Sequence, residues 1–137
     1  MVARGLAAAM MGSADAQQHV AALEAIRRQL ADTSIPFAAN MKPVLEIQAI
    51  EIAAAASAAA GEIDKAVETL RRATALEAAL PVPPGPPPLI KPSHELLGEL
   101  PLRAGRREEA AAAFAASLFR HPGRVLSIQG ATQAVGR

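Results

Sequence analysis

The sequence predicts an all-α fold of antiparallel helical hairpins, stacked as a short right-handed solenoid with a closing helix at its C-terminal end. Alanine, the strongest helix former, dominates tracts such as 53–56 and 110–113, and only 2% of the 137 residues are aromatic. Four positions also recur at the same offsets in two stretches: Gly61, Ala66, Leu70 and Ala73, then Gly105, Ala110, Phe114 and Ser117. Closely packed helices need such small residues where their backbones approach, with larger ones beside them. We therefore expect one helical domain over residues 1–137.

The hairpins are predicted at about 2–31, 44–80 and 93–120, and the closing helix at 123–135. Gly12, Gly61 and Gly105 mark the hairpin turns, because a helix often ends on a left-handed residue that glycine adopts cheaply. Residues 33–43 contain Pro36, Asn40 and Pro43, and these turn-forming residues predict a connector between helices. Gly130 is expected to weaken the closing helix from within. In the first hairpin, Gln17 occupies the position that corresponds to Ala66 and Ala110, where the repeated spacing predicts a small residue.

Prolines predict two local departures from regular helix. Seven of the 11 prolines lie in the stretch 81–92, which we expect to be a stiff polyproline-type strut between hairpins. Pro81 and Pro84 also form a P-x-x-P spacing, so the alternative is a ligand for a proline-binding module. Pro101 falls inside a predicted helix and is expected to kink it, to end it early, or to be tolerated because the helix is short.

The last hairpin resembles a tetratricopeptide repeat. The positions that carry the likeness are His94, Leu97, Gly98, Gly105, Ala110, Phe114, Ser117 and Pro122. A longer resemblance, to the C-terminal part of larger bacterial tetratricopeptide-repeat proteins, rests on 45–48 and on the Pro-Gly-Pro run that leads into Pro92–Glu99. It implies that the chain is a fragment of a longer solenoid, or a short equivalent of one. Met1–Leu6, which begins without an N-cap residue, agrees with that implication.

Composition and motifs argue against enzymatic activity and metal binding, so no catalytic residue, metal ligand or cofactor is predicted. The run His94–Gly98 begins like a zinc-protease helix, but glycine replaces the second histidine one turn later. Cysteine is absent, which excludes disulfides and thiolate sites. A formal net charge of +1 and the lack of a basic stripe with aromatic residues predict no nucleic-acid partner. No run of about 18 apolar residues predicts a membrane span.

The leading functional prediction is a non-enzymatic protein–protein interaction module. In the tetratricopeptide family, the first helix of each pair lines a concave groove that holds a peptide or protein partner. Carried over by position, the candidate groove residues are Gln48, Glu51, Glu95, Glu99 and Arg103. We expect Arg103 to pair with Glu99 and the remaining glutamates to favour a basic or amide-bearing peptide.

Two alternatives follow from the same repeats. One is a purely structural capping segment of a larger repeat protein, whose closing helix covers the end of the solenoid. The other is a regulatory subunit or co-chaperone attached to an enzyme. The Ala/Met-rich face of residues 1–11 is a possible surface for self-association. A cytoplasmic location is predicted, or export if residues 1–16, which outline a short signal peptide, act as one.

Overall fold

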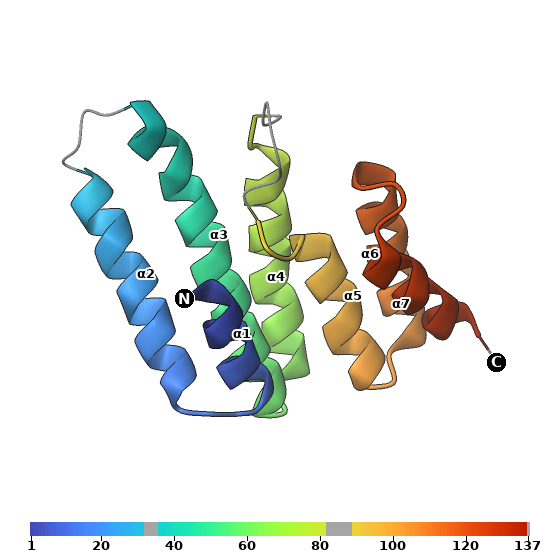
Figure 1. The fold of residues 1–137 in the computed structure, drawn as a ribbon. Coiled ribbons are helices and arrows are strands. Elements are labelled where there is room, and N and C mark those ends of the chain that lie inside the picture. Colours follow the sequence, from blue (N-terminus) through green and yellow to red (C-terminus); the bar gives the residue numbers. More distant parts are fainter. Residues whose placement is uncertain (32–35, 82–88, 137) are drawn as a thin grey trace. The chain divides into compact units, whose positions relative to one another are not determined.

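The computed structural model describes residues 1–31, 36–81 and 89–136, and these residues are helical, without any strand (Figure 1). The helices are α1 (Val2–Met10), α2 (Asp15–Ala31), α3 (Pro36–Ala59), α4 (Ile63–Ala78), α5 (Ser93–Arg103), α6 (Arg107–Arg120) and α7 (Val125–Val135). They confirm the predicted all-α class. The chain forms two compact units, Met1–Ile90 and Lys91–Arg137.

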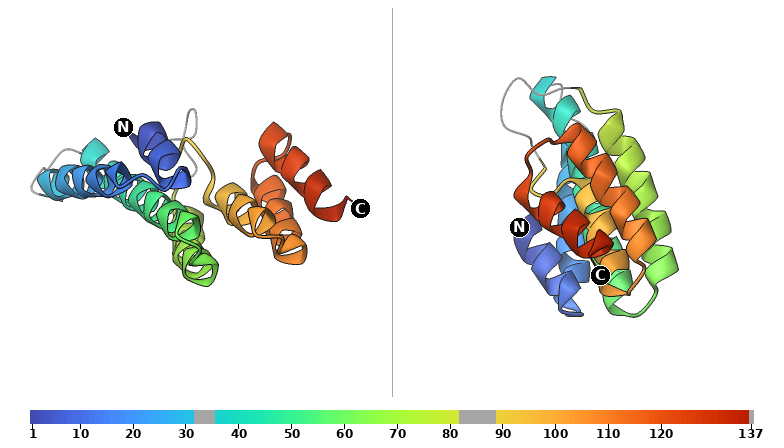
Figure 2. Two further views of the ribbon diagram at one scale, coloured as in Figure 1. Left: turned by 90° about the horizontal axis from the view of Figure 1, so that it is seen from below. Right: turned by 90° about the vertical axis from the view of Figure 1, so that its right-hand side faces the viewer.

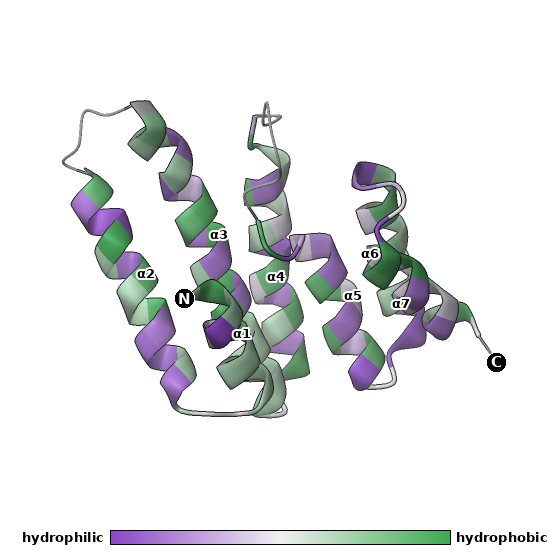
Figure 3. Cartoon of the chain, viewed as in Figure 1, coloured by the Kyte–Doolittle hydropathy of each residue, from purple (hydrophilic) through white to green (hydrophobic). Residues whose placement is uncertain are grey.

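The first unit is organised around α3, which packs against α1, α2 and α4. Both α1 and α3 are predominantly apolar, whereas polar residues recur along α2 (Figure 3). Contacts on three sides leave little of α3 exposed, and Ile47, Ile52 and Ala54 are fully buried. The short α1 lies against both α2 and α3 (Figure 2). A Cβ on Gly5 would be only 2.6 Å from the Ile52 Cδ1 atom. Glycine at this position therefore allows α1 to approach α3.

The connector predicted at 33–43 is wrong from residue 36 onward, because α3 begins at Pro36. Proline is well suited to the first helical position, where its missing N–H has no helical partner in any case. Pro43 lies inside the helix and removes one backbone hydrogen bond. Burial of Ala38 and Val44 on either side of Pro43 offsets that loss, so tertiary packing overrides the local signal. Residues 33–35 of the expected connector lie outside the described residues.

Each of the three hairpin turns closes with the same hydrogen bonds around its glycine. The N–H of Gly12, Gly61 and Gly105 donates to the carbonyl three residues earlier at 3.0 Å, and the next N–H donates to the carbonyl five residues before it at 2.9 Å. All three glycines have a positive φ, between +69° and +84°. The turns predicted from the sequence are therefore confirmed, and they share one Schellman geometry.

Gly105→Ala is expected to lower the free energy of unfolding by about 1 kcal/mol, because an alanine side chain disfavours a φ of +78°. No atom lies within 4 Å of the added Cβ, so the cost is conformational rather than steric. Urea unfolding followed by circular dichroism measures the loss. Gly105→Asn is the matched control and should lose less, because asparagine tolerates the left-handed region better. Equal losses in the two variants would contradict this account.

The second helices of the hairpins follow the repeated spacing in α4 and α6 but not in α2. Ala66, Leu70 and Ala73 of α4 are fully buried, as are their counterparts Ala110, Phe114 and Ser117 of α6. In α2 the corresponding Gln17 is exposed and its neighbour Ala16 is buried instead. Helix α2 also begins three residues after its turn glycine, compared with two in the other hairpins. The first hairpin is thus an irregular copy, as the position of Gln17 indicated.

The second unit is the α5–α6 hairpin with α7 packed against both of its helices. Helix α5 continues through the buried Pro101 to Arg103, so the early end considered from the sequence does not occur. Pro101 has no N–H to donate to the Leu97 carbonyl, so one helical bond is lost, as at Pro43. Its carbonyl accepts the closing bonds from the N–H groups of Ala104 and Arg106, at 3.0 and 2.9 Å.

Helix α7 has its smallest residues inside and its largest outside. Ser127, Gly130 and Ala134 are buried against the hairpin, whereas Val125 and Val135 are 62% and 72% exposed. The closing helix is thus present, but its outer face is not the polar one that a cap needs. Most of the predicted proline strut, residues 82–88, lies outside the described residues. None of the helices in the described ranges is long and apolar enough to span a membrane.

Candidate functional site

The packing of Phe114 determines how closely α5 and α7 approach α6. Its ring is fully buried between Gly98 of α5 and Gly130 of α7. A Cβ would lie 2.9 Å from the ring at Gly98 and 2.2 Å from the ring Cζ atom at Gly130. The glycine that was expected to weaken α7 is therefore required for its packing. Helix propensity alone does not reveal this requirement, because it depends on a side chain of another helix.

A groove of about 400 Å³ runs over Phe114 between α5 and α7. Its accessible lining consists of two apolar side chains and four long polar ones: Leu102 and Leu126, then Glu99, Arg103, Gln129 and Gln133. The buried Phe114 ring and Gly130 lie beneath them. The contributing positions of α7 are spaced by three and four residues, so one face of the helix forms one wall. This arrangement provides an apolar base with hydrogen-bonding groups on both sides.

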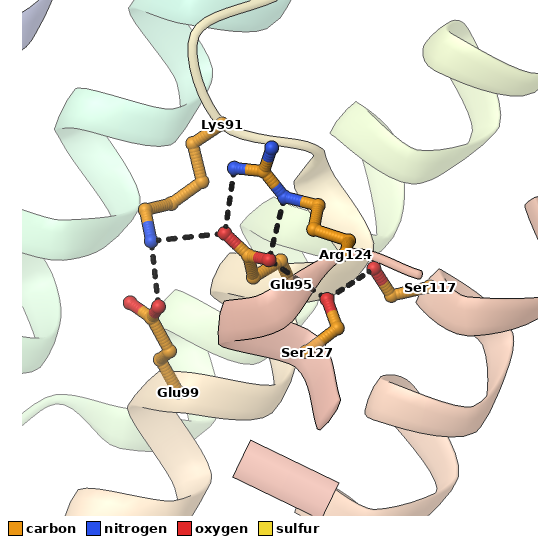
Figure 4. A network of polar contacts seen from close by, with 6 residues as sticks. All are labelled: Lys91, Glu95, Glu99, Ser117, Arg124 and Ser127. Carbon is orange, nitrogen blue, oxygen red and sulfur yellow. Dashed lines mark hydrogen bonds and ion pairs between the residues drawn. The ribbon is translucent and has the colours of Figure 1, made fainter. Parts of the chain in front are cut away.

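A buried carboxylate fixes the start of α7 to α5 (Figure 4). The side chain of Glu95 is fully buried and accepts hydrogen bonds from the Arg124 Nε and Nη2 atoms at 2.7 and 2.9 Å. The Ser127 hydroxyl donates to the same carboxylate at 2.7 Å and lies 2.9 Å from the Ser117 hydroxyl of α6. These contacts join all three helices of the unit. The network therefore fixes the orientation of the α7 wall of the groove.

Lys91, just before α5, completes this network. Its Nζ atom lies 3.3 Å from a Glu95 carboxylate oxygen and 2.6 Å from one of Glu99. Burial by itself raises the pKa of Glu95, but hydrogen bonds from Arg124 and Ser127, together with the positive charges of Lys91 and Arg124, lower it below the usual value. Glu95 is thus held as a carboxylate with its acceptors occupied. Such a group stabilises structure and is poorly placed to take up a proton in a reaction.

The five residues predicted to line a groove separate into three groups. Gln48 and Glu51 belong to the first unit and are buried on α3, at 5% and 1% exposure. Glu95 is buried in the network described above. Glu99 and Arg103 do line the groove of the second unit. Among the described residues Glu99 pairs with Lys91, so the Glu99–Arg103 pair expected from helical spacing is replaced by one from outside the helix.

The groove residues of α7 were missed in the sequence, although a signal was present. Leu126, Gln129 and Gln133 recur at intervals of three and four, which places them on one helix face. That spacing does not show which neighbouring helix the face adjoins. The Arg124–Glu95 pair joins residues 29 apart in the chain, and no local pattern indicates it.

The described residues contain no group of three or more His, Cys, Asp or Glu side chains able to hold a metal ion. Comparisons with protein families, with curated proteins and with solved structures find no match to the chain.

Proposed function

We propose that the chain is a non-enzymatic protein-interaction module of tetratricopeptide-like hairpins, and that the groove between α5 and α7 holds a short peptide segment of a partner protein. The observation that carries this proposal is the lining of the groove. Ligand sites combine an apolar base with a few well-placed polar groups, and this groove has both. The resemblance to the repeat family supports the same surface, because α5 is the first helix of its pair.

The two glutamines of α7 suit the main chain of an extended peptide. Gln129 and Gln133 are one helical turn apart on the same wall, and each amide can donate and accept hydrogen bonds. A peptide carries alternating N–H and C=O groups that can use both capacities. An apolar side chain of the peptide would then lie over Leu102 and Leu126.

Charge indicates which peptides fit. The carboxylate of Glu99 is neutralised by Lys91 at 2.6 Å. Arg103 is exposed, and no described residue forms an ion pair or hydrogen bond with it. The lining therefore carries a net positive charge, so the ligand proposed here differs from the basic or amide-bearing peptide predicted from the sequence. The proposed ligand has an acidic side chain close to an apolar one, with the carboxylate bound by the Arg103 guanidinium.

Selection of a random dodecapeptide library against the full chain is expected to give peptides that combine an acidic and an apolar residue. For a selected peptide, Arg103→Met should raise the Kd at least tenfold, since a charge-assisted hydrogen bond contributes about 1.5–3 kcal/mol. The Asn/Gln version of the peptide should bind weakly to both proteins. Fluorescence anisotropy of labelled peptides measures these constants.

Arg28→Met is the matched control, because Arg28 is an exposed arginine on α2, in the other unit. It should leave the Kd unchanged, whereas Leu126→Lys should abolish binding. Failure to select any peptide, or equal affinities in the Arg103 and Arg28 variants, would count against the groove. The alternative of a purely structural segment of a larger helical array would then be favoured.

A further inference from the structure

Lys91 neutralises a residue of the groove without belonging to the groove. Its ammonium lies between two carboxylates of α5, 2.6 Å from a Glu99 oxygen and 3.3 Å from a Glu95 oxygen (Figure 4). Glu99 contributes to the groove lining, whereas Lys91 does not. Lys91 is the first residue of the second unit and lies two positions before α5 begins. It can therefore act on a groove ligand through Glu99 rather than by contact.

The two carboxylates depend on Lys91 to different degrees. Glu95 also accepts hydrogen bonds from Arg124 and Ser127, so it stays paired when the lysine charge is removed. Of the residues that the structure describes, Lys91 alone forms an ion pair with Glu99. Loss of the Lys91 charge therefore leaves Glu95 paired and releases Glu99 at the groove.

A released Glu99 has a second partner within reach on its own helix. Arg103 lies four residues farther along α5, and a glutamate four residues before a cationic residue is the favourable order for a helical ion pair. The Lys91–Glu99 pair prevails because its two side chains are only 16% and 20% exposed. Solvent and salt screen it less than they would screen a pair with the exposed Arg103. Lys91 thereby keeps the Arg103 guanidinium available to a ligand.

We propose that Lys91 is a positioning residue that sets the charge preference of the groove, a role that rests on the peptide-binding function proposed above. With Lys91 in place, Glu99 is neutralised and Arg103 attracts a carboxylate of the ligand. Without the lysine charge, Glu99 repels that carboxylate, and it either pairs with Arg103 or attracts a basic side chain of the ligand. A residue outside the binding surface thus determines which peptides bind.

The two consequences of releasing Glu99 differ in size. An exposed ion pair between helical residues four positions apart changes an equilibrium by only about twofold, so competition for Arg103 is the smaller effect. Repulsion between two carboxylates in one groove is larger, because the effective dielectric constant near a protein surface is about 20 rather than that of water. Together they are expected to weaken the binding of an acidic peptide about fivefold or more.

Lys91→Met, which removes the charge and keeps an unbranched side chain, tests the proposal by fluorescence anisotropy. For an acidic peptide selected against the wild type, the Kd should rise about fivefold or more. For the version of that peptide with lysine in place of the acidic residue, the Kd should fall. Damage to the fold would weaken both peptides, so opposite shifts identify an effect of charge. Lys91→Arg should keep the wild-type preference.

Lys65→Met is the matched control, because Lys65 pairs with Glu62 at 2.7 Å in the other unit. It should change neither Kd. Glu99→Gln in the Lys91→Met background should restore the wild-type preference, since no carboxylate is then left to release. An unchanged preference in Lys91→Met, or one that Glu99→Gln does not restore, would overturn the proposal. Circular dichroism checks that each variant is folded.

The Arg103 guanidinium gives a readout that needs no peptide. In NMR of isotope-labelled protein, hydrogen exchange of the Arg103 Nε–H should be slower in Lys91→Met than in the wild type, and adding Glu99→Gln should remove the difference. If no peptide binds, the proposed function of the groove fails, and this exchange rate alone decides whether Lys91 keeps Arg103 free of Glu99. A slower rate would support that control, and an unchanged rate would overturn it.

Discussion

Glu95→Gln is expected to lower the free energy of unfolding by roughly 3 kcal/mol, the low end of the range for breaking a buried ion pair. The carboxylate is fully buried, and it accepts hydrogen bonds from Arg124 and Ser127 and pairs with Lys91. The glutamine amide cannot balance the two cations. Arg124 is 32% exposed and can turn toward solvent, which moderates the loss. Urea unfolding monitored by circular dichroism measures the change.

Glu68→Gln is the matched control for this variant. Glu68 pairs with Arg71 at 3.5 Å, and the two side chains are 78% and 63% exposed. Removing one partner of such a surface pair changes the free energy of unfolding by less than about 0.5 kcal/mol. Similar small changes at Glu95 and Glu68 would show that the buried network contributes little to stability.

The same network predicts the sign of a pH effect. The pKa of Glu95 is lower in the folded protein than the usual 4.5, so below that value the unfolded state takes up a proton more readily. The stabilisation is complete above the unfolded pKa and is lost as pH falls through the folded one. We expect the stability of the wild type to decline more steeply with acid below about pH 4.5 than that of Glu95→Gln. Parallel declines would contradict the lowered pKa.

Gly130→Ala is expected to lower the free energy of unfolding by about 1–3 kcal/mol through overpacking. Two effects oppose each other at this position. Alanine gains about 1 kcal/mol of helix propensity over glycine. Its Cβ, however, would lie 2.2 Å from the Phe114 Cζ atom, and the fully buried ring also lies 2.9 Å from the Cβ position of Gly98. The clash is therefore expected to prevail, and thermal unfolding measures the net loss.

A double-mutant cycle separates the clash from other consequences of the substitution. Phe114→Leu alone should destabilise the unit, because it leaves part of the ring volume empty. In the Phe114→Leu background, Gly130→Ala should be neutral or stabilising, since the smaller side chain makes room for the Cβ and the propensity gain remains. Additive losses would show that the ring and the glycine do not interact.

The features predicted correctly from the sequence are those determined by nearby residues. Gly61 and Gly105 mark turns whose bonds join residues within five positions of each other. The features missed depend on distant residues. From the neighbouring sequence alone, Pro36 and Pro43 indicate a break in the helix. The structure instead has α3 over residues 36–43, because Ala38 and Val44 are buried by neighbouring helices. Gly130 likewise indicates a weak helix from the sequence alone, whereas the structure shows that it makes room for the Phe114 ring of another helix.

The candidate site was predicted in part for the same reason. Helical spacing shows that Glu95, Glu99 and Arg103 share a face of α5, but it does not show what covers that face. Arg124 and Ser127 lie against Glu95 and remove it from solvent. Lys91 pairs with Glu99, the partner predicted for Arg103, and Arg103 lines the groove instead. A lysine eight residues before Glu99, beyond the start of the helix, lies outside any intrahelical pairing rule.

The shared hairpin turns have a kinetic consequence. Each brings two adjacent helices together across a few residues, so the entropy lost in closing these loops is small and most packing is between chain neighbours. Proteins with such low contact order cross their folding barrier quickly. Within the second unit the bonds from Glu95 to Arg124 and Ser127 span 29 and 32 residues and are among the exceptions. Helix α7 packs against both helices of the α5–α6 hairpin, so its docking depends on a hairpin that has already formed. We therefore expect α7 to dock last when the second unit folds and to detach first when it unfolds.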